Sequence, residues 1–139
     1  MQIVLASLAD YALVDQQGRL SVIGIFSQVW VSQFPAEHRR THLVIRVIGR
    51  RTEIGEHRIR IRFLDPDGRE LLGGDGTFNF GEPPAGVTFV EAAVILAYDL
   101  PLPRAGRYDV ELTLDADGST HLPLTAAQIP ASATRSPDA

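Results

Sequence analysis

The stretch G-R-Y-D-V-E-L-T-L-D-A-D-G-S-T-H-L-P-L, residues 106–124, decides the fold. Between residues 108 and 114 apolar and polar side chains alternate, which is the period-two pattern of a strand with one buried face. The D-A-D-G sequence at residues 115–118 then turns the chain, because Asp tolerates tight turn geometry and Gly accepts a positive φ. We therefore expect a β-hairpin, against which the preceding strands pack.

A second hairpin is predicted upstream. The segment H-R-I-R-I-R-F-L at residues 57–64 alternates strictly, so its apolar side chains are expected to point inward and its arginines outward. D-P-D-G at residues 65–68 supplies turn residues, and a return strand begins at residue 70. The glycine-rich residues 73–76 break that strand, and residues 77–80 either resume it after a bulge or form a strand of their own.

Four further segments are expected to be strands. Residues 87–98 contain alanines that favour a helix and β-branched residues that favour a strand, and the neighbouring pattern decides for a strand. Pro101 and Pro103 are expected to rule out regular pairing just after it, and residues 37–40 and 52–56 read as a loop and a turn. The expected strands are residues 2–8 (with 11–14 as a continuation or a short connection), 19–31 with a bulge or bend at Gly24, 41–49, and 87–98.

About eight short strands without a helix predict an all-β fold, and we expect an antiparallel immunoglobulin-like β-sandwich. The entry Gly106-Arg107-Tyr108 is similar to the tyrosine-bearing strand of such sandwiches, although a barrel remains an alternative. Residues 1–125 are expected to form a single domain. Residues 126–139, with two prolines and no apolar periodicity, are expected to be a flexible tail.

The composition removes several classes of function. The 139 residues include no cysteine and no lysine, which excludes disulfides, thiolate zinc sites and both of these nucleophiles. A net charge of -4 argues against general nucleic-acid binding. Residues 1–10 lack a basic leader and a long apolar run, so we expect a cytoplasmic protein without a membrane segment.

No motif predicts catalysis or a resident cofactor. The two D-x-D-G turns could offer carboxylates to calcium, but neither continues with the further acidic ligands of an EF-hand loop. The four histidines lie at spacings that do not place two imidazoles on one metal, and no serine lies in a G-x-S-x-G elbow. We therefore expect a protein that is not an enzyme, with no metal and no cofactor.

Arginines form the most notable charge cluster, and four of them are candidates for binding an anion: Arg46, Arg58, Arg60 and Arg62. The competing and favoured interpretation is a solvated sheet face. If residues 57–64 pair with residues 107–114, these arginines lie across from Asp109 and Glu111 and form cross-strand ion pairs. No aromatic residue interleaves the arginines, which argues against binding of single-stranded nucleic acid.

Several short motifs together resemble a bacterial family of small proteins known only as a domain of unknown function. They are L-A-D-Y-A at residues 8–12, G-R-L-S-V-I-G-I-F at 18–26, F-P-A at 34–36, L-D-P-D-G-R-E at 64–70 and P-x-x-G-x-Y at 103–108. The resemblance covers most of the chain up to about residue 124. It implies a β-rich bacterial cytosolic protein, and it assigns no catalytic residue.

Residues 20–31 and 87–98 are apolar on both strand parities, whereas a sandwich strand needs only one apolar face. A second apolar face can be covered by another subunit. Our first hypothesis is therefore a non-enzymatic interaction or assembly module that associates with itself or with another bacterial protein. The alternative is a protein that binds a small anion or calcium through the arginine face or the D-x-D-G turns.

Overall fold

The computed structural model describes residues 1–115 and 117–130, and most of these residues lie in β-strands. One turn of 3-10 helix, η1 (Arg51–Glu53), connects two of them. The nine strands of the described residues are β1 (Gln2–Val14), β2 (Leu20–Phe26), β3 (Gln28–Val31), β4 (Ala36–Arg50), β5 (Gly55–Leu64), β6 (Glu70–Phe80), β7 (Phe89–Leu102), β8 (Gly106–Leu114) and β9 (Asp117–Gln128). The all-β prediction is confirmed.

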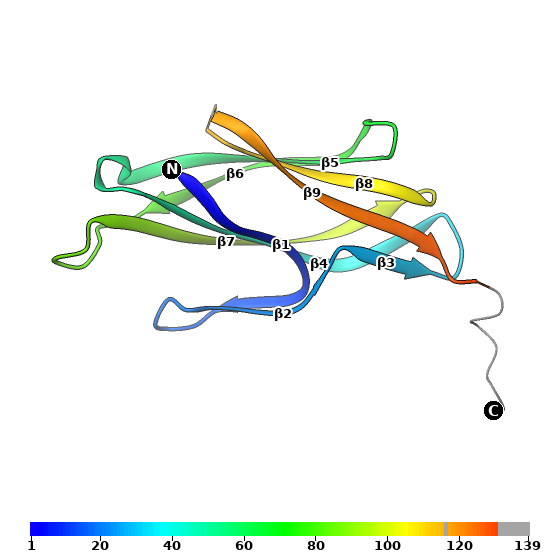
Figure 1. The fold of residues 1–139 in the computed structure, drawn as a ribbon, viewed down its shortest axis with the longest axis horizontal. Coiled ribbons are helices and arrows are strands. Elements are labelled where there is room, and N and C mark those ends of the chain that lie inside the picture. The colour runs from blue at the N-terminus through cyan, green and yellow to red at the C-terminus, as the bar shows by residue number, and fades with distance from the viewer. Residues whose placement is uncertain (116, 131–139) are drawn as a thin grey trace.

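The strands form two sheets that share one core (Figure 1). The first sheet has the order β2-β1-β4-β7, and the second has the order β3-β9-β8-β5-β6. The predicted hairpin of residues 106–124 is present as β8 and β9. Neighbouring strands are antiparallel with one exception, because β3 runs parallel to β9.

The apolar run at residues 20–31 explains this exception. It divides at Ser27 into β2, which belongs to the first sheet, and β3, which belongs to the second. The N–H of Thr125 donates to the carbonyl of Ser27 at 2.9 Å, which holds the crossing point against β9. The run is therefore two short strands in different sheets, whereas the sequence pattern predicts a single bent strand.

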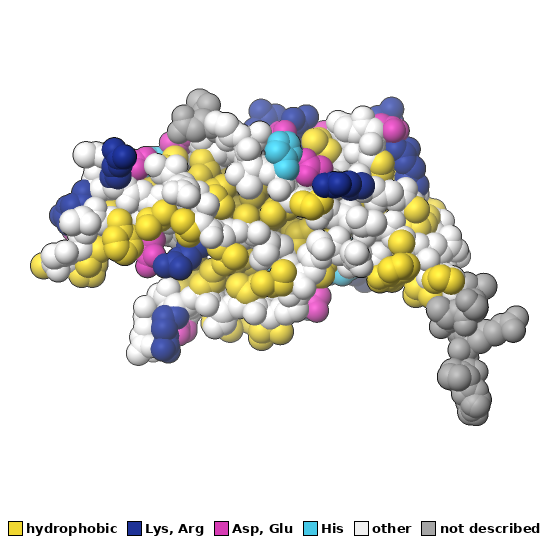
Figure 2. All heavy atoms as spheres, in the orientation of Figure 1, with side chains coloured by type: hydrophobic (Ala, Val, Ile, Leu, Met, Phe, Trp, Pro, Cys, Tyr) yellow, Lys and Arg dark blue, Asp and Glu magenta, His cyan; other side chains and the backbone are white. Residues whose placement is uncertain are grey.

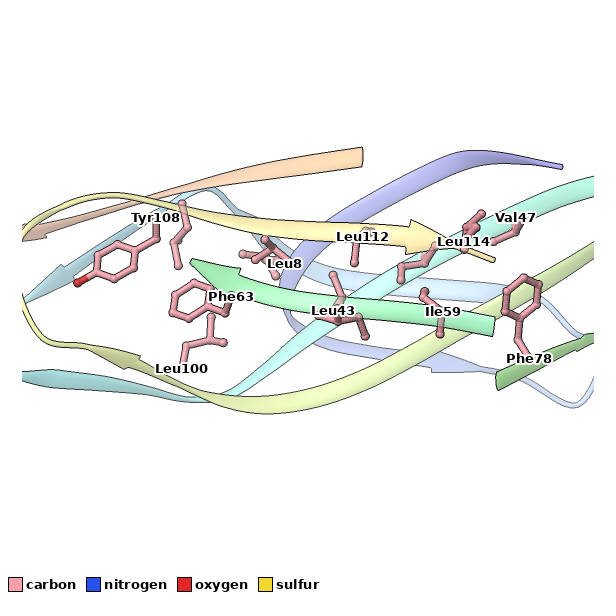
Figure 3. Close-up of a cluster of buried hydrophobic side chains, with 14 of the residues drawn as sticks. Leu8, Leu43, Val47, Ile59, Phe63, Phe78, Leu100, Tyr108, Leu112 and Leu114 are labelled. Carbon is pink, nitrogen blue, oxygen red and sulfur yellow. The ribbon is translucent and has the colours of Figure 1, made fainter. Parts of the chain in front are cut away.

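The core lies between the sheets and contains the residues predicted to point inward. Ile59, Ile61 and Phe63 of β5 and Leu112 of β8 are all buried, and Ile61 lies directly opposite Leu112. Figure 3 shows Phe63 of the second sheet beside Leu100 of the first. Full burial of one such side chain contributes about 1.5–3 kcal/mol, so this alternation is the main source of the fold's stability.

Tyr108 fixes the corner between β7 and β8. Its ring is fully buried and stacks on Phe63 at a centroid distance of 5.4 Å. Its hydroxyl donates to the carbonyl of Arg104 at 2.6 Å and accepts from the N–H of Arg104 at 3.1 Å. The corner therefore keeps its backbone groups hydrogen-bonded although the ring lies in the core.

Two strands continue through residues that were expected to end them. β6 runs through residues 73–76, which pair with residues 59–62 of β5. β7 runs to Leu102, with Pro101 opposite Glu37 of β4. Both strands lie at sheet edges, where a missing N–H or a weak strand former removes fewer hydrogen bonds than in a central strand.

Two other strands are longer than expected. β4 begins at Ala36 and includes the residues predicted to be a loop, with a bulge between His38 and Thr41 where Arg40 has a φ of 52°. β9 ends at Gln128, beyond the expected domain end at residue 125, and its Ala126 is buried. Residues 131–139 of the expected tail lie outside the described residues.

β1 changes its partner along its length. Residues 2–9 pair with β4, whereas residues 8–14 pair with β2. Beyond Ala9 the strand bends away from β4, and its second half forms a hairpin with β2 that projects from the body of the molecule (Figure 1). We call residues 10–26 the arm.

Candidate functional site

The arm carries a concentration of exposed apolar side chains. Ile23 and Ile25 are 60% and 62% exposed, and Tyr11, which lies opposite Ile23, is 48% exposed. Leu13 and Val14 are also exposed, so five of the nine exposed large hydrophobic side chains among the described residues lie in the arm. Apolar side chains that gather in this way mark an interaction surface, whereas single ones are ordinary.

Two of the charges of the arm, Asp15 and Arg19, lie at its tip, whereas the carboxylate of Asp10 lies beside Gly24. Asp15 at the tip accepts hydrogen bonds from the backbone N–H groups of Gln17 and Arg19 and from the Arg19 guanidinium. The bond from the Arg19 N–H is the main reason that the pKa of Asp15 is lowered. Residues 20–31 contain no charged side chain at all. The strand β2, which forms the free edge of the arm, therefore carries no charged side chain of its own.

A groove of about 620 Å³ lies between the arm and the part of the first sheet formed by β4, β7 and the first half of β1. In Figure 2 the arm stands apart from the body across this hollow. Its arm side is lined by Val14, Leu20 and Val22, and its sheet side by Leu5, Ala93 and the ion pair of Arg46 with Glu91. The arm therefore has an inner face directed to the groove and an outer face that carries Ile23 and Ile25.

Sequence reasoning identified only part of this surface. It singled out residues 20–31, which contain Ile23 and Ile25, as apolar on both parities. It did not include Tyr11 and Leu13, although the run Y-A-L-V at residues 11–14 is equally apolar. The signal that was overlooked is that two apolar runs flank one turn, because a hairpin places such runs side by side.

The structure divides the four arginine candidates between two sheets. Arg46 lies on the first sheet and pairs with Glu91. Arg62 lies on the second sheet and pairs with Glu111 at 2.9 Å and with Glu70 at 2.8 Å. The arginines were expected to lie across from Asp109 and Glu111. This holds for Arg62, which lies opposite Glu111, but Arg60 lies opposite Thr113 and Asp109 lies opposite Leu64.

Arg58 and Arg60 lie together in an open groove of about 600 Å³ on the second sheet, beside Thr77. Asp75 and Asp115 line the same groove, so its charge is mixed. An anion bound there would meet two carboxylates as well as two guanidinium groups. This arrangement favours the arginine face as a solvated surface over an anion site.

Two histidines form ion pairs that the sequence spacing did not predict. His121 lies opposite Glu111 in the β8–β9 ladder and contacts Asp109 through Nδ1. This contact is the main cause that raises the pKa of His121. His57 contacts Asp115 Oδ2 through Nδ1 at 2.9 Å and the carbonyl of Glu53 through Nε2 at 2.6 Å.

The first carboxylate of each D-x-D-G turn is engaged by neighbouring groups of the chain. Asp65 accepts hydrogen bonds from the N–H groups of Asp67 and Arg69, both at 2.9 Å, and the bond from Arg69 is the main cause of its lowered pKa. Asp115 accepts from the N–H of Arg58 at 2.8 Å and contacts His57. Over residues 1–115 and 117–130 no group of three or more histidine or acidic side chains is placed to hold a metal ion.

Comparison with known proteins leaves the activity open. No helix among the described residues is both long enough and apolar enough to cross a membrane. A comparison with curated proteins found no match. The model of one protein family matches residues 4–127, which is most of the chain and includes the arm and both sheets. The chain therefore belongs to the family of unknown function DUF6941.

Proposed function

We propose that the chain is a non-enzymatic assembly module of a bacterial cytosolic system and that it associates with itself through the arm. The observation that carries this proposal is the exposure of Tyr11, Ile23 and Ile25 on a projecting hairpin whose β2 strand has no charged residue. Burial of such a surface by a partner is favourable, because it removes apolar side chains from water.

The free energies of burial and association indicate that several side chains of the arm have to be buried together. Full burial of one exposed isoleucine contributes about 1.5–3 kcal/mol, whereas association of two proteins costs roughly 4–15 kcal/mol in lost freedom of motion. Ile23 alone therefore does not hold two chains together. A symmetric contact counts each side chain twice, so Tyr11, Ile23 and Ile25 from two chains together reach the required range.

An immunoglobulin-like topology is part of the same proposal. Immunoglobulin domains hold strands A, B and E in one sheet and C, F and G in the other. In chain order β1, β4 and β7, which are neighbours in the first sheet, correspond to A, B and E, and β5, β8 and β9 correspond to C, F and G, with β2 added at the edge beside β1. The hydrogen bonds of Tyr108 at the start of β8 support this correspondence, because immunoglobulin-like sandwiches carry such a tyrosine on strand F.

The test is the absolute mass in solution, measured by light scattering on a size-exclusion column over a concentration series. We expect the wild-type chain to exceed its monomer mass of 15.2 kDa and to be unaffected by calcium. The variant Ile23→Arg/Ile25→Arg is expected to be a monomer, because paired arginines at the contact repel and lose hydration.

The matched control is Trp30→Arg, which replaces a side chain that is 58% exposed on β3, outside the arm. It is expected to keep the wild-type mass. A wild-type chain that is monomeric at every concentration would remove self-association from the proposal. An oligomer that Trp30→Arg dissociates, and the double arm variant does not, would place the contact at β3 instead.

A further inference from the structure

The two sheets have four edge strands, and three of them carry features that hinder pairing with another strand. β3 has only four residues, β6 contains Glu70 and Asp75, and β7 contains Glu91, Asp99 and Pro101. Short length, charge and proline are the usual means by which proteins protect sheet edges. β2 differs, because its seven residues L-S-V-I-G-I-F include no charge and no proline, and its one departure from extended backbone is Gly24, with a φ of 71°.

Among residues 1–115 and 117–130, no backbone group pairs with the free side of β2. The N–H of Asp15 donates to the carbonyl of Arg19 at 2.9 Å, so Arg19 directs its carbonyl toward β1 at the end of the β1–β2 ladder. Successive residues of an antiparallel strand direct their N–H and C=O groups to opposite sides. Leu20 and Val22, at odd steps from Arg19, therefore direct these groups away from β1 and toward the free edge.

The chemistry of the edge defines its partner. A charged strand placed beside β2 would bring its charges against Ile23 and Ile25, so the partner has to be extended, neutral and apolar. β2 of a second copy satisfies these conditions, and two identical strands related by a twofold axis meet antiparallel. We propose, resting on the assembly function above, that β2 pairs with β2 of a second copy and joins the two four-stranded first sheets into one continuous sheet.

The register follows from the length of the strand. Pairing all residues of Leu20–Phe26 with their symmetry mates centres the contact on Ile23 and places Val22 opposite Gly24 and Ser21 opposite Ile25. Because Val22 directs its backbone groups to the free edge, Ile23 occupies a non-hydrogen-bonded position of the new ladder. The Cα atoms of such a pair lie about 4.5 Å apart, so the two Ile23 side chains would be in contact.

The absence of cysteine from the chain permits a clean cross-linking test. In Ile23→Cys the single thiol can form a disulfide only with a second copy, and the expected pair distance suits that bond. Mild oxidation is expected to give a covalent dimer on a non-reducing gel. The control Ile25→Cys is expected to remain monomeric when alone and to form a covalent dimer when mixed with Ser21→Cys, because these two positions lie opposite each other in the proposed register.

A second variant tests the role of the backbone. Val22→Pro removes the N–H that β2 directs to the free edge and leaves the hydrogen bonds to β1 in place. We expect far-UV circular dichroism to be unchanged and the dissociation constant of the dimer to rise at least tenfold, on the order of one lost hydrogen-bonded pair with its neighbouring contacts.

The outcomes separate this inference from the proposed function. A wild-type chain that is monomeric overturns both. A wild-type oligomer that persists in Val22→Pro, together with no disulfide in Ile23→Cys, overturns the pairing of β2 and leaves self-association standing. Disulfide formation in Ile23→Cys with loss of the dimer in Val22→Pro supports the pairing and its register.

Discussion

At the scale of single residues, the titratable side chain of His57 is held by hydrogen-bond partners on both sides of its ring. Its two ring nitrogens contact Asp115 Oδ2 and the carbonyl of Glu53, and both partners are hydrogen-bond acceptors. Only the protonated imidazolium has an N–H on each nitrogen. The Glu53 carbonyl first and then the Asp115 carboxylate raise the pKa of His57, so the charged ring connects β5 to the end of β8.

This arrangement predicts a pH-dependent contribution to stability. A raised pKa in the folded chain stabilises it fully below the unfolded value of about 6.5, and the contribution is lost as the pH rises through the folded value. His57→Gln is therefore expected to cost about 1–3 kcal/mol of unfolding free energy at pH 5 and less at pH 9. Asp115 stays ionised at pH 5 because its pKa is lowered, mainly by the N–H of Arg58. Urea unfolding at both pH values measures the difference.

The control for this prediction is His121→Gln. The side chain of His121 is 50% exposed, so solvent screens its contacts with Asp109 and Glu111. Its replacement is expected to change the unfolding free energy by less than about 1 kcal/mol at either pH. If His57→Gln lowered stability equally at pH 5 and pH 9, the ring would contribute through packing against Phe78 and Phe80 and not through its charge.

At the scale of elements, the strands that alternate strictly could be predicted from the sequence. Residues 57–64 and 108–114 each have one apolar face, and burial of that face determines which way the side chains point. Residues 20–31 were predicted as a single strand. Apolar residues indicate that a segment packs against an apolar surface, but they do not indicate which of the two sheets provides that surface. The change of sheet at Ser27 depends on contacts with β9, which lies about 100 residues later in the chain.

The candidate site was predictable to a smaller extent. Parity alone placed Arg58, Arg60 and Arg62 on one outer face, and the structure agrees that they alternate with buried residues. Their ionic partners depend on cross-strand register, which places Glu111 opposite Arg62 but Thr113 opposite Arg60. The position of the arm could not be predicted, because the bend after Ala9 follows from the point at which β1 exchanges β4 for β2.

The geometry of the arm depends on Gly24, and this predicts the effect of a methyl group there. Gly24 has a φ of +71°, and a Cβ at this position would lie 2.5 Å from the carboxylate of Asp10. A positive φ costs a residue with a side chain about 1–2 kcal/mol. Gly24→Ala is therefore expected to destabilise the chain by at least about 1–2 kcal/mol and to speed amide hydrogen exchange in residues 10–26. Urea unfolding and hydrogen-exchange mass spectrometry check the two effects.

Two variants separate the contributions to this effect. Asp10→Ala/Gly24→Ala removes the carboxylate and keeps the unfavourable φ, so it is expected to recover part of the loss. Gly81→Ala is the matched control, because a Cβ at Gly81 would meet no atom within 4 Å. Equal effects of Gly24→Ala and Gly81→Ala would contradict the strain that we assign to the arm.

At the scale of the whole molecule, the apolar residues of the core and those of the arm contribute to stability in different ways. The core residues of β4, β5, β8 and β9 are buried within one chain, so they stabilise the fold at any concentration. The exposed side chains of the arm contribute only when a second copy covers them. Stability that comes from the second copy has to depend on protein concentration, whereas stability that comes from the core does not.

This division predicts the thermal behaviour of the chain. If the arm pairs in the folded state and not in the unfolded state, a hundredfold increase in protein concentration stabilises the dimer by about 2.7 kcal/mol, shared between two chains. For a domain of this size the melting temperature is expected to rise by roughly 3–6 °C over that range, and calorimetry at several concentrations measures it. Ile23→Arg/Ile25→Arg is expected to melt at one temperature throughout, because its folded state is monomeric. A wild-type melting temperature that is independent of concentration, in a chain shown to be dimeric by its mass, would mean that the dimer separates before it unfolds, so that contacts within one chain alone determine its thermal stability.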